Sequence, residues 1–327
     1  MTRKVKEGMI MRIRLGYVAI ALRLENCSPS KTVTLKNINR IEGYSNQINR
    51  LIRIARENLE NTLRILKANA YDDIKVYRFT SKLVPLCTHP QFHGWDYIAD
   101  LKDAFEEIGS FVKRHQIRVS LHPDHFTLLN SPHPEVQKAS RIDLEYHLRI
   151  IEAMKLGEEV KLVMHAGGKY EDKKLALTRF KTQFKELPAG IRSRIVIEND
   201  DRCYNAAEVL HLAQELSIPM VLDIHHHQIL NQGEEISELM PEIFLTWKGA
   251  LPKIHISSPK VPDDPRTHAD FIEVDRAMDF LNIARSNGQD FDLMIEAKQK
   301  DLALFKLGKD LSTHQYQLKN NGEIQLN

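Results

Sequence analysis

The stretch from Pro219 to Gln228, PMVLDIHHHQ, combines a buried strand with side chains that could bind a metal ion. A short apolar run follows the proline and ends in Asp223, and three histidines, His225 to His227, follow after one isoleucine. A carboxylate and the imidazole of His226, three residues apart where a strand turns into a loop, can reach a common divalent cation. The alternative is a solvated histidine-rich turn, and this stretch alone does not separate the two.

Other apolar runs of the chain end in the same way, with a histidine or a carboxylate. The candidate side chains are His89, His122, His165, Glu198, Asp223, His226, His255, His268 and Glu296. Six such endings in succession are improbable by chance, so the pattern predicts a metal centre. A closed structural zinc site is not expected because the set contains no cysteine, and mixed imidazole and carboxylate ligands suit Zn²⁺ or Mn²⁺.

The number of candidate ligands exceeds what one ion needs. We therefore expect two or three divalent ions bridged by carboxylates, with Glu198 on a middle strand as the bridge. Mn²⁺ is the first expectation, and Zn²⁺, Mg²⁺ and Co²⁺ are alternatives. Clusters of this kind stabilise both the attacking and the leaving oxygen of a phosphodiester.

Lys253 lies two residues before His255, so both side chains face the same side of a strand. An ammonium group beside a cluster of dications is electrostatically unfavourable. Lys253 is therefore expected to point at a substrate phosphate, to be deprotonated, or to be an anionic carbamate. The plain alternative is a lysine whose ammonium reaches water at the start of the strand.

Eight short runs rich in Val, Ile and Leu are predicted to be the strands that position these residues. They are Met11–Val18, Ile74–Thr80, Ile117–His122, Val160–His165, Arg194–Asn199, Met220–Ile224, Lys253–Ser257 and Phe291–Ala297. Stretches with helical periodicity separate them. The alternation predicts a single (β/α)8 TIM barrel over residues 1–312, with the active site at the C-terminal ends of the strands, and a polar tail over 313–327. An open doubly wound sheet is less favoured because no glycine-rich phosphate loop follows the first strand.

Composition sets wide bounds on the function. The chain has 327 residues and a net charge of +2, so a nucleic-acid partner is permitted but not required. Three scattered cysteines fit no zinc or redox spacing and favour a reducing cytosol. Arginines interrupt the apolar stretch near the N-terminus, and no run reaches the length of a membrane span. The sequence predicts a soluble, cytoplasmic protein without a membrane segment.

The ordered series LGYV, THP, LHPDHF, HAGG, IEND, DIHHH, KIHIS, R-x-HADFI and IEAKQKD resembles the UV damage endonuclease family, which is related to endonuclease IV. The resemblance extends from about Met11 to Asp301. It implies a barrel that holds several divalent metal ions and acts on damaged double-stranded DNA. The implied reaction is incision immediately 5′ of cyclobutane dimers and 6-4 photoproducts, leaving a 3′-hydroxyl, with other distorting lesions as an open extension.

The resemblance also implies roles for single residues. Position by position, the metal ligands would be His122, His165, Glu198, Asp223, His226, His255, His268 and Glu296. His89 would contact substrate or metal, and Lys253 matches a lysine that the family can carry in carboxylated form, so these two and Glu198 are the expected catalytic residues. Tyr17 would line the lesion pocket. His125 and Phe126 stand where one branch of the family has a Gln-Tyr probe that enters the duplex, so an aromatic ring is kept while the amide and the phenol are lost.

Three other functions remain open at this stage. They are cleavage at abasic sites in the manner of endonuclease IV, Mn-dependent sugar isomerisation or epimerisation, and lesion binding without catalysis. Nicking assays on abasic and photoproduct duplexes, a ketose–aldose assay, and a gel shift without a nick would distinguish them. A single domain with an open mouth needs no obligatory protein partner, so a monomer is expected.

Overall fold

The computed structural model describes residues 10–261, 263–314 and 316–326. Eight parallel strands form a closed barrel, because neighbouring strands pair in the order β10-β7-β6-β5-β4-β3-β2-β1 and β10 also pairs with β1. The strands are β1 (Met11–Val18), β2 (Val76–Arg78), β3 (Arg118–Leu121), β4 (Lys161–His165), β5 (Ile195–Glu198), β6 (Met220–Asp223), β7 (Lys253–Ile256) and β10 (Phe291–Ile295). All eight strands predicted from the sequence are present, and the predicted (β/α)8 barrel is confirmed.

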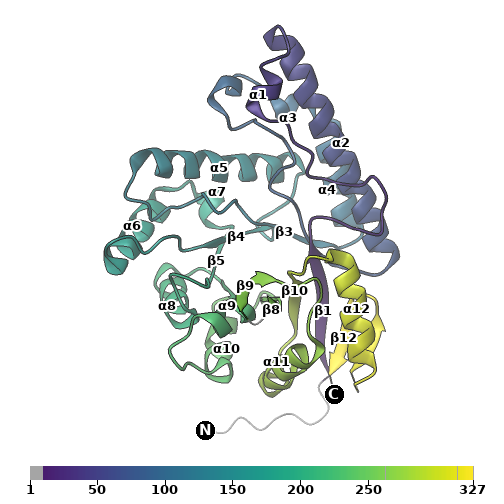
Figure 1. The fold of residues 1–327 in the computed structure, drawn as a ribbon, viewed down its shortest axis with the longest axis vertical. Coiled ribbons are helices and arrows are strands. Elements are labelled where there is room, and N and C mark those ends of the chain that lie inside the picture. The colour runs from purple at the N-terminus through teal and green to yellow at the C-terminus, as the bar shows by residue number, and fades with distance from the viewer. Residues whose placement is uncertain (1–9, 262, 315, 327) are drawn as a thin grey trace.

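Helices connect the strands and surround the barrel, as Figure 1 shows. They are α1 (Leu35–Ile38), α2 (Tyr44–Tyr71), the 3-10 turn η1 (Pro90–Phe92), α3 (Tyr97–Asp100), α4 (Lys102–Arg114), α5 (Pro134–Ala153), α6 (Lys173–Glu186), α7 (Ala189–Arg192), α8 (Ala206–Leu216), α9 (Ile224–Ile229), α10 (Ile236–Leu245), α11 (Val274–Asn287) and α12 (Lys300–Ser312). None of the helices in the described part of the chain is both long and apolar enough to cross a membrane.

The barrel strands are apolar because both of their faces are buried. All four residues of β5, β6 and β7 are buried, the outer ones against helices and the inner ones inside the barrel. The long helix α2 turns its apolar stripe toward the barrel, with Leu51, Leu59 and Leu66 almost fully buried. The core is therefore continuous around the barrel, and only the strand ends are free to carry chemistry.

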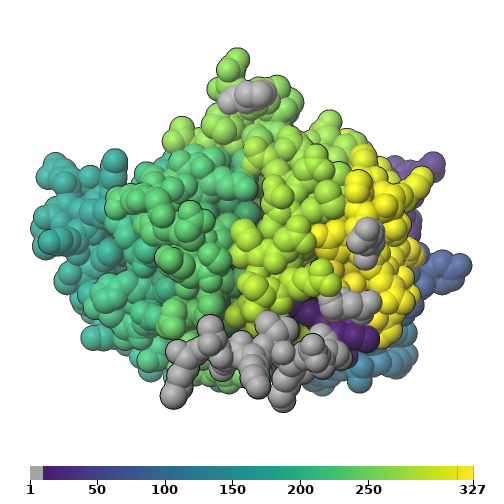
Figure 2. All heavy atoms as spheres, turned by 90° about the horizontal axis from the view of Figure 1, so that it is seen from below, coloured from purple at the N-terminus to yellow at the C-terminus, as the bar shows by residue number. Residues whose placement is uncertain are grey.

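The segment predicted to be a polar tail contains a hairpin that joins the sheet. Strands β11 (Gln317–Asn320) and β12 (Glu323–Leu326) pair with each other, and β12 runs antiparallel to the first half of β1. Because β2 pairs only with Gly16–Val18, the start of β1 would otherwise expose an unpaired edge. Ile324 and Leu326 alternate with polar residues and are buried there. In Figure 2 the purple start of β1 lies beside the yellow C-terminal segment.

A second hairpin, absent from the sequence prediction, follows β7. It consists of β8 (Pro259–Val261) and β9 (Asp264–His268), forms a separate two-stranded sheet, and ends at a candidate metal ligand. Most residues of the hairpin are exposed. In Figure 2 a segment in the light green of this part of the chain projects at the top, beyond the rest of the surface. The hairpin therefore carries His268 back toward the barrel mouth from outside the strands.

Candidate metal centre

Neighbouring strands bring the candidate ligands to one height at the mouth of the barrel. In the parallel pairing, His165 of β4 lies opposite Glu198 of β5, and Asp223 of β6 lies opposite His255 of β7. Residues paired on adjacent parallel strands point to the same side, so each pair points into the barrel, and Glu198 and His255 of the two pairs meet at 2.7 Å. Side chains from distant parts of the sequence meet because each strand ends at the same edge.

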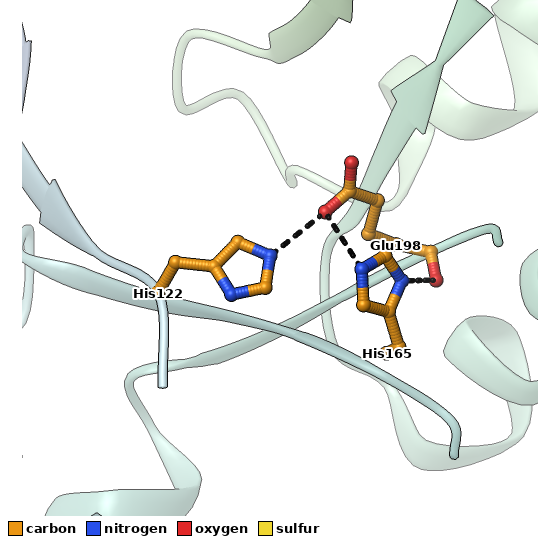
Figure 3. A group of neighbouring side chains, drawn as sticks. All are labelled: His122, His165 and Glu198. Atoms are coloured by element: carbon orange, nitrogen blue, oxygen red, sulfur yellow. Dashed lines mark hydrogen bonds and ion pairs between the residues drawn. The ribbon is translucent and has the colours of Figure 1, made fainter. Parts of the chain in front are cut away.

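Glu198 is the centre of these candidate ligands, which are together called the ligand layer. It is almost fully buried, and its Oε2 lies 3.2 Å from Nε2 of His122 and 3.9 Å from Nε2 of His165. Figure 3 shows both imidazoles directed at the same carboxylate oxygen. The other oxygen, Oε1, lies 2.7 Å from Nδ1 of His255. One carboxylate is thus in contact with three imidazoles.

Three groups of side chains have the spacing that a metal ion requires, and Glu198 belongs to all of them. The groups are His122, His165 and Glu198; Glu198, His255 and Glu296; and Glu198, Asp223 and His226. Within each group the ligand atoms lie within 4.8 Å of one another. The carboxylate that the sequence indicates as a bridge is therefore the one shared by all three groups.

His268 completes the set of imidazoles without belonging to any of these groups. Its ring centroid lies 6.3 Å from that of His226, and its Nδ1 donates to the backbone carbonyl of Glu296 at 2.7 Å. The structure thus places all eight residues predicted as ligands at the mouth, seven of them in groups that share one carboxylate.

Backbone carbonyls orient most of the imidazoles. Nδ1 of His122, His165 and His226 donates to the carbonyls of Pro123, Glu198 and Asn199 at 3.0, 3.4 and 3.0 Å, and His268 has the same arrangement. Such a bond fixes the orientation of the ring and leaves Nε2 as the atom that can bind a cation once it has lost its proton. Metal-binding histidines are held in this way, so the arrangement fits the binding of cations.

Two buried polar atoms of the site make no hydrogen bond to any residue that the structure describes. They are Nε2 of His255 and Oδ2 of Asp223, the latter 3.8 Å from Nδ1 of His226. Leaving such atoms unpaired costs about 1–3 kcal/mol each, so native structures rarely retain them without a bound group. Unpaired imidazole and carboxylate atoms beside a shared carboxylate fit divalent cations, and the residues present suit the predicted metal centre.

The electrostatics of the layer favour charged carboxylates. Burial alone would raise the pKa of Glu198, but the imidazoles of His255 and His165 outweigh burial and hold its pKa well below the usual range. Burial opposes charge on His255 as well, yet Glu198 and Glu296 raise its pKa to about 9. Without cations, Glu198 and Glu296 therefore keep His255 protonated near neutral pH. A divalent cation that binds this imidazole must displace that proton.

Arg78 is a residue of the site that the sequence did not reveal. It ends β2, and its Nη1 lies 2.5 Å from Oε1 of Glu296, where the guanidinium is the largest influence that lowers the pKa of this carboxyl. The only signal was an arginine inside the apolar run Ile74–Thr80. His225 is a second residue of this region that the sequence pattern does not single out. It is buried, and its ring lies 5.6 Å from that of His268.

Lys253 lies deeper in the barrel than the ligand layer. As predicted, it faces the same side of β7 as His255, but its Nζ donates to Oγ of Ser120 on β3 at 2.8 Å. Burial and the nearby Arg118 lower its pKa to about 7. The structure therefore gives Lys253 a hydroxyl as its direct partner rather than any of the candidate ligands.

Two further predicted site residues have other contacts. The imidazole of His89 caps η1, where Nδ1 accepts from the backbone N–H of Gln91, and none of its described contacts reaches the ligand layer. Tyr17, expected to line the lesion pocket, instead faces outward from β1. It is fully buried, donates to Asn69 of α2 at 2.7 Å, and packs edge-on against Tyr77.

His125 and Phe126 form an exposed turn at the rim, close after the candidate ligand His122. The Phe126 side chain is 49% exposed, and the two rings pack edge-on at 5.9 Å. A cleft of about 260 Å³ opens beside this turn at the ends of β1, β2 and β3. Its lining includes Val18, Ala19, Arg78, Lys82, His122 and His125.

Comparisons with known proteins agree with this geometry. The family model described as "UV-endonuclease UvdE" matches residues 13–327. The UV DNA damage endonuclease of Bacillus cereus strain B4264 is 40% identical to the chain, over 92% of this chain and 95% of that protein. The UV DNA damage endonuclease of Halalkalibacterium halodurans is 41% identical, over 93% of this chain and 95% of that protein. The crystal structure of SacUVDE superposes with a TM-score of 0.83 at 30% identity, covering 92% of this chain and 99% of that one.

More distant solved structures share the fold alone. Endonuclease IV from Thermus thermophilus superposes with a TM-score of 0.54 at 13% identity, covering 92% of this chain and 99% of that one. A D-tagatose 3-epimerase-like protein gives a TM-score of 0.55 at 12% identity, covering 92% and 97%. The barrel by itself therefore does not separate nucleases from epimerases, and the distinction depends on the close relatives.

Proposed function

Because the chain belongs to the UV-endonuclease UvdE family, we propose that it incises double-stranded DNA immediately 5′ of UV photoproducts and leaves a 3′-hydroxyl. The observation that supports this most strongly is Glu198, a buried carboxylate shared by three potential metal-binding groups at the barrel mouth. Phosphodiester hydrolysis at such a centre needs several cations close together, and a shared carboxylate allows that spacing.

The residues that would hold the ions are the eight ligands named above, in the three groups around Glu198 and with His268 beside His226. Divalent cations, Mn²⁺ in our proposal, supply Lewis acidity toward the phosphate oxygens and lower the pKa of bound water. The chain itself supplies pre-oriented imidazoles and, in Glu198, a buried carboxylate kept deprotonated by its neighbours.

Arg78 has two parts in the proposed site. Its guanidinium holds Glu296 in place, and the side chain also lines the cleft at the ends of β1, β2 and β3. A phosphate in this cleft would meet Arg78 and Lys82, with His122 on the side of the metal centre. Guanidinium groups bind phosphate through paired donors, so the cleft suits the DNA backbone next to the scissile bond. His89, whose described contacts do not reach the candidate ligands, would contact the substrate when DNA is bound. For Lys253, which is buried and bonded to Ser120, a part in the reaction stays a prediction from the sequence, and a Ser120→Ala variant tests it.

The exposed Phe126 is proposed to enter the duplex. UV photoproducts stack poorly, so opening the helix there costs less than at undamaged steps. An aromatic ring without polar atoms can occupy the gap and kink the duplex without forming a hydrogen bond. Selection of damaged DNA would thus depend on the ease of unstacking and not on reading a base sequence.

A nicking assay on duplexes with one defined photoproduct tests the proposal. We expect a single cut 5′ of the lesion in the presence of Mn²⁺, no cut in the intact duplex, and no cut after chelation. Matched duplexes with an abasic site rank the endonuclease IV type of activity against this one. Equal cutting of damaged and intact duplex, or activity only as a ketose epimerase, would contradict the proposal.

A further inference from the structure

The loop that carries Phe126 begins at the metal centre. His122 is a candidate ligand, its Nδ1 donates to the carbonyl of Pro123 at 3.0 Å, and its own carbonyl accepts from the hydroxyl of Ser81. Phe126 follows only four positions after His122 in the chain. The hydrogen bonds at His122 therefore fix the start of the loop, and with it one side of the Phe126 ring's support, relative to the candidate metal ligands.

Buried polar side chains of α5 hold the other side of the turn. Thr127 is 4% exposed, and its Oγ1 donates to Oδ2 of Asp143 at 2.6 Å. The next backbone N–H, of Leu128, donates to Oγ of Ser140 at 2.8 Å. Nδ1 of the fully buried His147 donates to the backbone carbonyl of Asp143 at 2.7 Å and lies 3.6 Å from the same Oδ2.

The end of the loop is bound to a second ligand-bearing segment. Nδ2 of Asn130 donates to the carbonyl of Gly168 at 2.6 Å, three residues after His165. A Cβ on Gly167, whose φ is +98°, would lie 2.2 Å from Oδ1 of Asn130, so the two loops touch closely. Buried polar side chains therefore hold both ends of the loop that carries the exposed Phe126 ring, which indicates that the position of the ring matters.

We propose that Asp143 and Ser140 are positioning residues for lesion recognition, because they hold Thr127 and Leu128 and so fix where His125 and Phe126 stand relative to the metal centre. This inference rests on the proposed function. The ligand is the gap between bases at the lesion of a damaged duplex. Asp143 and Ser140 act only through the turn formed by His125 and Phe126. They are remote from the cations and take no part in the cleavage step.

The test compares two forms of one photoproduct duplex. In the first form the strand opposite the lesion is fully complementary, and in the second it is mismatched over the same bases, so the helix is already open. Thr127→Val removes the hydroxyl and keeps the shape of the side chain. We expect kcat/KM on the paired duplex to fall about tenfold, as for the loss of one buried hydrogen bond, and kcat/KM on the open duplex to change less than about twofold.

Coupling to Phe126 gives the second readout. Phe126→Ala should show the same pattern, and adding Thr127→Val to it should cause no further loss, because the anchor acts through that ring. Glu145→Gln removes a carboxylate from the exposed face of the same helix and is the matched control, with no change on either duplex. Ser140→Ala and Asp143→Asn carry the same expectation if the Thr127 variant does not fold.

An equal loss on paired and open duplexes, additive losses in the double variant, or wild-type values for the anchor variants would each overturn the inference. Failure of the proposed function has a different signature, since the wild-type chain would then nick neither duplex.

Discussion

Two buried charged layers lie one above the other in this barrel, and they differ in how completely their atoms are paired. In the lower layer, Asp292 of β10 accepts from Nε of Arg14 and from Nη1 of Arg118, both at 2.7 Å. Lys253 donates to Ser120 in the same region. In the upper layer, around Glu198, Nε2 of His255 and Oδ2 of Asp223 are buried and make no hydrogen bond to any residue that the structure describes.

The difference indicates which of the two clusters needs a ligand. The lower layer satisfies both carboxylate oxygens of Asp292 with arginines of the chain, so it needs no added ligand. The upper layer contains carboxylates and imidazoles whose potential ligand atoms lie within 4.8 Å of one another in each group. Burial of charge alone therefore does not mark a functional site, whereas unpaired buried lone pairs around a shared carboxylate do.

Removal of Glu198 should have the largest effect, because all three potential metal groups share it. We expect Glu198→Ala to lower the nicking rate at least about a thousandfold, since a bridged metal centre contributes several kcal/mol to the transition state. The measurement is single-turnover nicking of a photoproduct duplex at saturating Mn²⁺. A variant that retains more than about a tenth of the wild-type rate would show that the upper layer is not the catalytic centre.

Removal of Asp292 should affect stability and leave metal binding intact. Asp292→Asn leaves two partly buried arginines without a counter-charge, which should lower the free energy of unfolding by about 3 kcal/mol. Denaturant unfolding of the metal-free protein measures this. Asp290→Asn is the matched control, because Asp290 pairs with the exposed Arg12 and should contribute only about 0–1 kcal/mol. Loss of bound metal in the Asp292 variant would mean that the two layers are not independent.

Removal of the Ser120 hydroxyl should have the smallest effect and tests whether Lys253 belongs only to the lower layer. Ser120→Ala should cost about 1 kcal/mol of stability, the net value of one hydrogen bond, and change kcat less than about threefold. Unfolding and nicking are measured on the same preparation. A fall in kcat without a fall in stability would instead assign Lys253 to the reaction, as the sequence suggests.

The barrel strands and the residues of the upper layer could be predicted from sequence because both depend on local pattern. Apolar runs of Val, Ile and Leu mark strands buried on both faces, and β1 has the predicted bounds. The strand ends then bring His122, His165 and Glu198 together, because parallel strands of a barrel end at one face.

What escaped prediction depends on contacts between distant segments. Strand β12 is recognisable only beside the unpaired edge of β1, and the β8–β9 hairpin is too polar to read as strands. Tyr17 faces α2 because Arg14 and Gly16 occupy the inward positions of β1, opposite Asp292 and Met294. Lys253 shares a face with His255 but lies two residues lower, about 7 Å along the strand, so it meets Ser120 instead of the ligands.

The central claim is that the carboxylates and imidazoles around Glu198 hold divalent cations together. Elemental analysis of the chain after chelation, reloading with Mn²⁺ and desalting tests it directly, with Glu198→Ala in parallel. We expect two or three ions per wild-type chain and at most one in the variant, because the variant lacks the ligand common to all three groups. Equal metal content in the two proteins, or no metal in the wild type, would contradict the account.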